Sequence, residues 1–166
     1  EEQTVMETRF RIEAIGSVRI GEQGPCIEVD RQYVPALTRL QGFSHLQILW
    51  WAHLTDSPQD RDTLIAEKLF KKGPDRLGIF ATRAPARPNP IMVSTIQVTG
   101  IDFENGIIET PFIDADDSTP VLDIKPYFPM ERVQDPAVPA WCRHWPTWQE
   151  DTMTFDWQAE INFGSA

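Results

Sequence analysis

The chain contains 166 residues, which is the length of one ordinary domain. Its apolar fraction of 41% and charged fraction of 24% are typical of a soluble globular protein. No apolar run approaches the roughly eighteen residues of a membrane-spanning helix, and the first ten residues lack the pattern of a secretory signal. A net charge of −10 repels phosphate backbones and anionic membranes, which excludes a general nucleic-acid coating protein.

Cysteine and histidine usage argues against disulfide and metal sites. The two cysteines, Cys26 and Cys142, lack CxxC spacing, which favours a reduced, cytoplasmic protein. His45 and His53 lie eight residues apart, so on one strand they would be roughly 26 Å apart and could not share an ion. We therefore expect no metal site. The sequence also lacks the glycine-rich motifs of doubly wound nucleotide-binding domains.

Charge is unevenly distributed along the chain. Residues 68–87 contain six basic side chains and one acid, a local balance of +5, whereas residues 101–119 contain six acids and no base. Two interpretations are equally open: solvated loops of opposite sign, or a functional polarity in which the basic stretch faces a polyanion.

Alternation of apolar and polar residues predicts most of the elements. In chain order, it predicts strands over residues 10–14, 45–53, 91–103 and 153–163. The second of these is nearly all apolar, as expected of a strand covered on both faces. The third is followed by a turn signal, Glu104-Asn105-Gly106, which leads into Ile107 and Ile108.

Helical signals are weaker. Residues 34–40 are a short candidate helix that Gly42 closes, and Ser57-Pro58 resembles a helix start with a capping serine. TLIAEKLF at residues 63–70 could be a helix or a strand, and GIFAT at 78–82 resembles a strand; with the turn at KKGPDR between them, the pattern favours a hairpin. The fold class is therefore mainly β, a barrel or sandwich with few short helices. In the segment from Pro136, we expect Trp141, Trp145 and Trp148 to be packing anchors.

A proline-rich segment follows the basic hairpin. Pro85, Pro88 and Pro90 restrict residues 80–94 to extended geometry. The resulting stiff loop holds three side chains that suit a carboxylate, a phosphate or a flat base: Arg83, Arg87 and Asn89. A purely structural loop is an equally good interpretation of the prolines.

A second informative segment is DADDSTPVLDIKPYFP at residues 114–129. On a strand, Asp123 and Lys125 share one face and Leu122 and Ile124 the other. Pro126 ends the strand and leaves Tyr127 just beyond it. An ordinary surface ion pair is the alternative to a functional site here.

Four ordered motifs resemble a known family. FSHL at residues 43–46, GIFATR at 78–83, RPNPI at 87–91 and TPVLDIKPY at 119–127 resemble the TsaA-like, or YaeB-like, family. Its best-known members are S-adenosylmethionine-dependent tRNA methyltransferases of the TrmO type. The resemblance covers about residues 10–129. It implies a small closed or partly open β-barrel over residues 1–135, with a Trp-rich C-terminal extension over 136–166, a short helix plus strand, that packs on the barrel.

The resemblance also implies an activity and its partners. Family members bind S-adenosylmethionine and methylate N6 of N6-threonylcarbamoyladenosine at tRNA position 37, usually as homodimers. The resemblance implies the same cofactor, substrate and dimeric state for this chain. Matched position by position, it assigns the cofactor to His53, Leu54, Arg83, Val93, Phe112, Ile113, Asp114 and Ala115. It makes Arg87 and Asn89 candidate substrate-binding residues, and Asp123, Lys125 and Tyr127 candidate catalytic residues.

The chain departs from the family pattern at three places. A Pro-Arg-Gln loop that contributes to the cofactor site in the tRNA enzymes would lie between Arg19 and Gly24 and is absent. Met92 replaces a glycine after PNPI, and Ser118 replaces the glycine of an Asp-Gly-Thr-Pro turn. Because serine tolerates positive φ less well than glycine, we expect that turn to differ or to be strained.

Three functions follow from these residues. The first is a tRNA methyltransferase, in which Asp123 accepts a proton, Lys125 or Tyr127 polarises a substrate oxygen, and the basic stretch faces RNA. The second is a methyltransferase of a small molecule, which the net charge and the missing loop favour. The third is a cofactor-binding module without catalysis.

Overall fold

The structure is a computed structural model and describes residues 8–164, so most of the N-terminal segment judged for a signal sequence lies outside the described residues. The chain forms two compact units. Unit 1 contains residues up to 53 and 91–127, and unit 2 contains residues 54–90 and from 128 onwards. The boundary expected near residue 135 remains a prediction about domain organisation.

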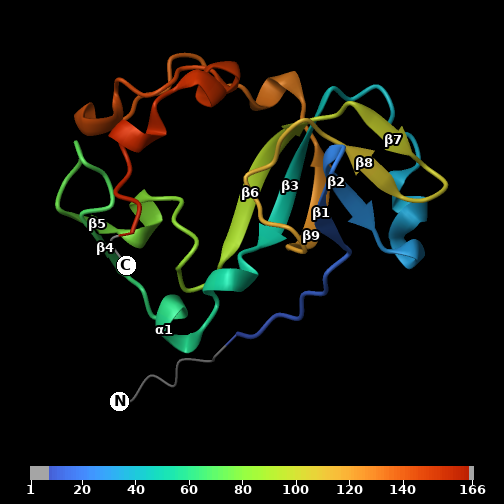
Figure 1. Ribbon diagram of the computed structural model, residues 1–166, viewed down its shortest axis with the longest axis horizontal. Coiled ribbons are helices and arrows are strands. Elements are labelled where there is room, and N and C mark those ends of the chain that lie inside the picture. Colours follow the sequence, from blue (N-terminus) through green and yellow to red (C-terminus); the bar gives the residue numbers. More distant parts are fainter. Residues whose placement is uncertain (1–7, 165–166) are drawn as a thin grey trace. The chain divides into compact units, whose positions relative to one another are not determined.

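Unit 1 is built on one antiparallel sheet, shown in Figure 1. The strand order is β6-β3-β9-β1-β2-β8-β7. The strands are β1 (Gly16–Gly21), β2 (Gly24–Val29), β3 (His45–Trp51), β6 (Ile91–Gln97), β7 (Gly100–Asp102), β8 (Ile107–Glu109) and β9 (Pro120–Pro126). The mainly β class is therefore confirmed.

The expected barrel is not confirmed. The edge strands β6 and β7 are joined by only two residues, yet no ladder pairs them within the described part of the chain. The backbone N–H groups of that link are used elsewhere: Val98 donates to the Ser44 carbonyl at 2.8 Å and Thr99 donates to the Glu109 carbonyl at 2.9 Å. These bonds continue the pairing of β6 with β3 and of β7 with β8.

Alternation along β3 places the core of unit 1. Leu46, Ile48 and Trp50 are buried, whereas the residues between them are only half-buried. β3 is therefore covered fully on one face, and the expectation that both faces are covered is wrong. The core side chains from the other strands include Val18, Ile27, Ile96, Ile108 and Val121, all at most 2% exposed.

Local turn chemistry fixes the connections within unit 1. The expected turn between β7 and β8 is confirmed: the Asp102 carboxylate accepts the backbone N–H groups of Glu104 and Asn105, both at 3.0 Å. Gly106 closes that turn with a φ of +69°, and a Cβ there would lie 2.7 Å from the Val34 side chain. Glycine is therefore required at this position by both backbone conformation and space.

Unit 2 begins with a capped helix and the expected hairpin. α1 (Pro58–Arg61) starts as predicted, with the Ser57 hydroxyl accepting the backbone N–H of Asp60 at 3.1 Å. β4 (Ile65–Glu67) and β5 (Arg76–Gly78) pair antiparallel, which confirms the hairpin. The rest of unit 2 is mostly loops and single turns of 3₁₀-helix.

Apart from α1, the helical elements of the described chain are 3₁₀-helices. They are η1 (Arg31–Leu37), η2 (His53–Thr55), η3 (Ile79–Ala81), η4 (Pro129–Glu131), η5 (Ala140–Cys142), η6 (Gln149–Thr154) and η7 (Trp157–Ala159). The helix expected over residues 34–40 is thus displaced towards η1. Pro35 inside it removes a backbone donor, which favours a short 3₁₀ turn over a longer α-helix.

Two expected strands are absent from the described residues. Residues 10–14 are not a strand: Phe10 is 84% and Ile12 53% exposed, so their alternation faces no core. The strand expected over 153–163 is replaced by parts of η6 and η7, and only Ile161 forms an isolated bridge, with Phe70. The C-terminal extension therefore contains 3₁₀ turns where a helix plus strand was expected.

Aromatic packing explains why the C-terminal segment keeps this irregular form. The Phe70 ring lies 5.2 Å from that of Trp141 and 5.0 Å from that of Trp145, and the Trp145 and Trp157 rings are 5.3 Å apart. The expectation of packing anchors is thus confirmed for Trp141 and Trp145. Trp148 is 61% exposed and does not belong to this cluster. No helix between residues 8 and 164 is long and apolar enough to span a bilayer.

The turn before β9 has the strain expected from its serine. Ser118 has a φ of +65°, and its N–H donates to the Val18 carbonyl at 2.8 Å, which holds the residue in that conformation. A non-glycine residue in the left-handed region costs about 1–2 kcal/mol. Its hydroxyl accepts one exposed bond, from Arg19 at 3.1 Å, which contributes little in return.

We therefore expect Ser118→Gly to raise the free energy of unfolding by about 0.5–1 kcal/mol, because glycine removes the steric penalty but adds chain entropy to the unfolded state. Urea denaturation of the purified protein measures the change. Ser118→Ala is the matched control, since it loses the same hydroxyl and keeps the Cβ. If the glycine variant is no more stable than the alanine variant, backbone strain at Ser118 is not significant.

Candidate functional site

The candidate catalytic residues lie on the open face of the sheet in unit 1, opposite the core. In the register of β3 with its neighbours, Leu49 pairs with Val93 on β6 and with Asp123 on β9. Gln47 likewise pairs with Thr95 and Lys125. Directly paired residues of antiparallel strands point to the same face. Val93, Asp123 and Lys125 therefore share one surface, although Val93 lies about thirty residues before the other two in the sequence.

Asp123 and Lys125 form the ion pair that the strand pattern predicts. The Lys125 ammonium lies 2.9 Å from Asp123 Oδ2, and both side chains are about half exposed. The other carboxylate oxygen accepts the backbone N–H of Ile124 at 2.9 Å. The hydrogen bond from Lys125 to Asp123 raises the pKa of the lysine above its usual value. Lys125 is therefore a permanent cation here and a hydrogen-bond donor, whereas Asp123 is the acceptor of the pair.

Tyr127 lies beside a histidine that the sequence did not suggest as a functional residue. The Tyr127 backbone N–H donates to the His45 carbonyl at 3.1 Å, and the two rings meet edge-on with centroids 6.4 Å apart. The His45 Nδ1 atom is 2.8 Å from the Ser44 hydroxyl. His45 shares its face of β3 with Gln47, the partner of Lys125. A spacing of two residues along a strand is the sequence signal that places His45 and Gln47 on one face.

The remaining unit 1 candidates lie at or near the edge strand β6. Val93 is 42% exposed on this strand, whose outer backbone edge pairs with no other strand in the described part of the chain. In the segment after β8, Phe112 is 51% exposed, whereas Ile113 and Ala115 are buried in the core. The Ser94 hydroxyl donates to Asp114 and connects this segment to β6. His53, the last residue of unit 1, begins η2 and is half-buried.

The proline-rich loop of unit 2 is held by its own polar side chains. The Arg87 guanidinium donates to the carbonyls of Thr82 at 3.1 Å and Ala84 at 3.2 Å. Arg61, at the end of α1, donates to the Pro88 carbonyl at 2.8 Å and to the Asn89 side-chain oxygen at 3.1 Å. No local sequence pattern predicts this role for Arg61. Arg87 and Asn89 thus have internal partners that fix the loop.

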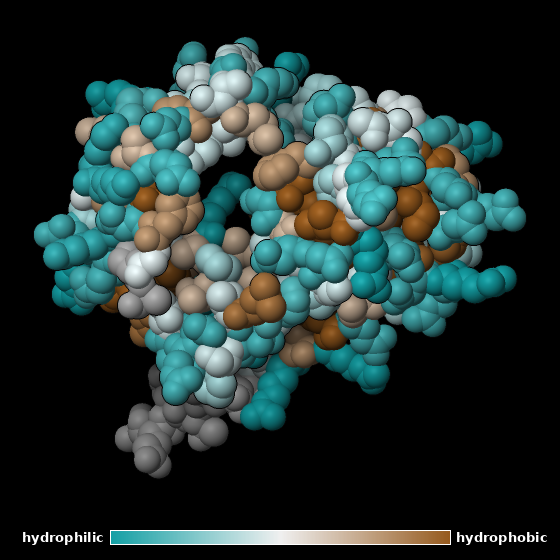
Figure 2. Space-filling model, viewed as in Figure 1, coloured by the Kyte–Doolittle hydropathy of each residue, from teal (hydrophilic) through white to brown (hydrophobic). Residues whose placement is uncertain are grey.

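Arg83 differs from its neighbours in the same loop. It is exposed, and among residues 8–164 its guanidinium makes no hydrogen bond or ion pair. Leu54, also in unit 2, is 67% exposed. The surface in Figure 2 is largely hydrophilic, with separate apolar patches over the sheet of unit 1. In the proline-rich loop, Arg83 is therefore available to bind an anion, whereas the hydrogen bonds of Arg87 and Asn89 make the loop rigid.

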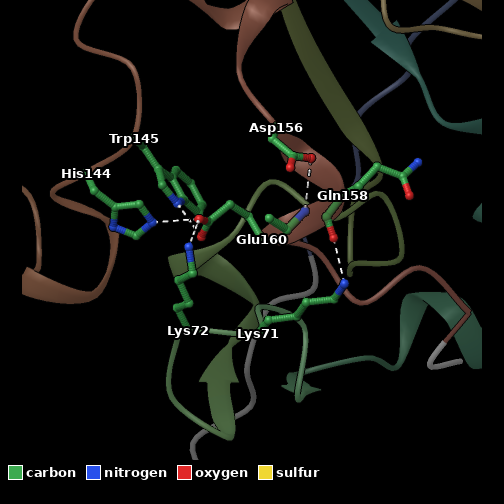
Figure 3. A network of polar contacts seen from close by, with 8 residues as sticks. Lys71, Lys72, His144, Trp145, Asp156, Gln158 and Glu160 are labelled. Carbon is green, nitrogen blue, oxygen red and sulfur yellow. Dashed lines mark hydrogen bonds and ion pairs between the residues drawn. The ribbon is translucent and has the colours of Figure 1, made fainter.

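Two lysines of the basic stretch contact the C-terminal segment of unit 2, as Figure 3 shows. Lys72 lies 2.8 Å from the carboxylate of Glu160, whose side chain is only 3% exposed. Lys71 donates to the Gln158 carbonyl at 2.6 Å, and Arg76 pairs with Glu67 at 3.1 Å. In unit 2, these cations have structural partners. Fewer residues of the basic stretch are therefore available to face RNA than the sequence suggests. Lys68 is one of them, because it is exposed and its side chain has no partner among the described residues.

Glu160 is the centre of this network in unit 2. Besides Lys72, its carboxylate contacts His144 Nε2 at 2.7 Å and accepts the Trp145 indole N–H at 3.2 Å. The hydrogen bond from Lys72 is the largest of the effects that lower the pKa of Glu160 to about 2. Sequence reasoning missed this residue because its partners come from segments sixteen and eighty-eight residues away.

Comparison with known protein families matches residues 13–131 to the tRNA-methyltransferase O N-terminal domain. A protein of Methanothermobacter thermautotrophicus, named as a probable S-adenosyl-L-methionine-binding protein, is 34% identical over 121 residues, 72% of this chain and 81% of the relative. The tRNA (adenine(37)-N6)-methyltransferase of Escherichia coli K12 is 40% identical over 96 residues. That match covers 57% of this chain but only 40% of the relative.

Comparison with solved structures also finds similarity to tRNA-methyltransferase O proteins. The crystal structure of TrmO from Pseudomonas aeruginosa matches with a TM-score of 0.60 and 29% identity, over 78% of this chain and 61% of that chain. The family resemblance derived from the four sequence motifs is therefore confirmed. This chain spans less than two thirds of the Escherichia coli and Pseudomonas proteins.

The Glu160 network predicts a pH-dependent stability. Because the folded pKa is about 2 and the ordinary value is 4.5, the carboxylate stabilises the folded state fully above about pH 4.5. We expect that contribution to be lost as the pH falls from about 4.5 towards 2. In Glu160→Gln the unfolding temperature at pH 7 should be lower, and its fall below pH 4.5 should be shallower.

Circular dichroism melts between pH 7 and 2.5 measure this dependence. Glu150→Gln is the matched control, because Glu150 is an exposed carboxylate of the same C-terminal segment. It should follow the pH profile of the parent. Identical profiles for the two variants would show that Glu160 is not the group responsible.

Proposed function

Because the chain belongs to the tRNA-methyltransferase O family, we propose that it transfers the methyl group of S-adenosylmethionine to N6 of N6-threonylcarbamoyladenosine at position 37 of tRNA. The name of the Escherichia coli relative supports the position and the atom. The Methanothermobacter relative, which this chain covers more fully, supports the cofactor. Under this proposal the chain works in the cytoplasm, where tRNA is modified, and we expect it to be a homodimer.

The observation that carries the proposal is the shared face of Val93, Asp123 and Lys125 in unit 1. Val93 and Asp123 are each paired with Leu49, so about 10 Å separates their strands at the usual interstrand spacing. Val93 on the edge strand β6 would thus hold the cofactor on the same face as the ion pair, with β3 between them. Phe112 and Asp114, which follow β8, supply an apolar ring and a carboxylate for the adenosine end.

The proposed reaction is an in-line displacement. S-adenosylmethionine would supply the methyl group: its bond from sulfur to the methyl carbon would break as the bond from N6 to that carbon forms, which would leave a neutral thioether. N6 of the acceptor carries one proton and is a weak nucleophile because the carbamoyl group withdraws its electron pair. In this mechanism Asp123 accepts that proton, and Lys125 donates a hydrogen bond to the carbamoyl oxygen. Tyr127, next to His45, provides a second donor.

Within unit 2, we assign different roles to the polar residues of the proline-rich loop. Arg83, with no internal partner among the described residues, contacts the cofactor or a phosphate. Arg87 and Asn89, whose polar atoms are already engaged, present the loop to the substrate in one conformation. His53 and Leu54, neighbours in the sequence, are the remaining residues of the proposed set of cofactor contacts.

A second function is favoured by one specific observation. The net charge is −10, and most of the basic stretch is engaged within the protein, which together favour a small-molecule acceptor over a polyanion. The experiment that separates the two uses tRNA containing N6-threonylcarbamoyladenosine but lacking its methyl group. Nucleoside mass spectrometry after incubation with protein and S-adenosylmethionine detects the methylated product. A protein that binds S-adenosylmethionine and methylates nothing would be a binding module.

The proposal predicts that Asp123→Asn lowers kcat for tRNA methylation by about 10²–10⁴-fold, because the proton acceptor is lost, while the affinity for S-adenosylhomocysteine is unchanged. Single-turnover kinetics and calorimetry measure the two quantities. Asp30→Asn is the matched control, since Asp30 is exposed in unit 1 and its side chain does not cap η1. Full activity of Asp123→Asn would exclude Asp123 as the proton acceptor.

The proposal also predicts a local charge effect in unit 2. Lys68→Glu and Arg143→Glu each change the net charge from −10 to −12 at an exposed position, and only Lys68 belongs to the basic stretch. We expect Lys68→Glu to weaken tRNA binding and to reduce the slope of log Kd against log salt by about 1, as one phosphate contact is lost. Filter binding at several salt concentrations measures both. Equal effects of the two variants would show that only the net charge matters.

A further inference from the structure

A buried hydrogen-bond chain in unit 1 connects the core to the segment of residues 112–115. The indole N–H of Trp50, on β3, donates to the Ser94 hydroxyl at 2.9 Å. The Ser94 hydroxyl in turn donates to Asp114 Oδ1. Trp50 is 7% and Ser94 8% exposed, so the bond between them is shielded from water, whereas Asp114 lies at the exposed end of the chain of bonds. None of the family motifs in this sequence assigns a role to Ser94 or Trp50.

The chemistry of the three groups fixes the direction of the chain. An indole N–H can only donate, and an ionised carboxylate can only accept. The single hydroxyl proton of Ser94 must therefore point to Asp114 while its lone pair receives the proton of Trp50. Each bond thus orients the next, and the bond to the carboxylate is of the stronger, charge-assisted kind. The other oxygen of Asp114 has no hydrogen-bond partner among the described residues.

The segment that this chain holds has few other anchors. Residues 110–116 lie outside the strands, and the Thr110 hydroxyl bond to the Phe112 carbonyl at 3.1 Å is local. The side chains of Ile113 and Ala115 are buried, which holds the segment on the core. Their burial does not determine where the Asp114 side chain between them points. Ser94 is the covalent neighbour of Val93. The bond from Ser94 to Asp114 therefore joins the two parts of unit 1 proposed to contact the cofactor.

We propose that Ser94, aimed by Trp50, is a positioning residue for S-adenosylmethionine that holds residues 112–115 against the edge strand β6. This inference rests on the proposed cofactor site and names residues that do not themselves touch the cofactor. A preorganised segment loses less entropy when the ligand binds, so the loss of the anchor weakens affinity more than it slows the methyl transfer itself.

The test compares Ser94→Ala with Thr119→Val. Thr119 is also buried in unit 1, and its hydroxyl donates to the Asp116 carbonyl at 2.7 Å, outside the 112–115 segment. Both variants lose a buried hydroxyl and should lower the unfolding temperature. We expect only Ser94→Ala to raise the Kd for S-adenosylhomocysteine by about tenfold in calorimetry, the loss typical of one hydrogen bond to a charged group. Its KM for S-adenosylmethionine should rise more than its kcat falls.

Two further variants keep the inference testable if Ser94→Ala folds poorly. Trp50→Phe removes the first donor but keeps an aromatic ring in the core, and should give a smaller rise in Kd. Ser94→Thr keeps the hydroxyl and should retain most of the affinity. Hydrogen exchange of the protein without ligand should be faster at residues 112–115 in Ser94→Ala and unchanged there in Thr119→Val.

The outcomes distinguish this inference from the function on which it rests. If the parent protein binds S-adenosylhomocysteine and Ser94→Ala binds it equally well, the positioning role is wrong and the proposed function stands. If the parent protein binds neither S-adenosylmethionine nor its product, the proposed function fails and the cofactor role of Ser94 fails with it. Faster exchange in both Ser94→Ala and Thr119→Val would mean that only general stability was lost.

Discussion

The register of β3 between β6 and β9 is the constraint on which the architecture of unit 1 depends. β3 is paired on both sides, and its alternate residues Leu46, Ile48 and Trp50 are buried. A slip of one residue against either neighbour would turn these side chains to the open face, so burial fixes the register strongly. The same register aligns Val93 and Asp123 on either side of Leu49. The geometry of the candidate site is therefore a consequence of core packing and needs no separate device.

Unit 2 depends on a different interaction, a buried carboxylate that organises an irregular segment. Because 3₁₀ turns satisfy few backbone groups, residues 140–163 need side-chain partners to keep one conformation. Glu160 gathers Lys72, His144 and Trp145 around one buried charge, and the aromatic rings beside it exclude water. Removing one partner of such a group is costly, since the remaining charge stays buried. The hairpin and the C-terminal segment are thus parts of one structure.

The sequence predicted the features that depend on local patterns and missed those that depend on distant partners. Alternation located β3 and β6, and turn residues located Gly106 and the start of α1, because these signals lie within a few residues. The Asp123–Lys125 pair follows from a spacing of two on a strand. Alternation failed at residues 153–163, where no neighbouring strand completes a ladder and aromatic packing decides the conformation. The Trp50–Ser94–Asp114 chain and the Arg61 contacts join segments twenty or more residues apart, which no local pattern encodes.

The charge distribution decides how a protein of net charge −10 would approach RNA. A cation that already has a buried carboxylate as its partner contributes little to phosphate binding, because it must give up that partner first. Lys72 is such a cation, and Arg87 donates to carbonyl groups of its own loop. The effective positive field is therefore smaller than the balance of +5 in residues 68–87 suggests. Under the proposed function, recognition of tRNA would accordingly rely on a few exposed cations and on contacts to the modified base itself. Such an interface would be specific for the acceptor nucleoside and only weakly dependent on salt, whereas a broad basic surface would be strongly salt-dependent.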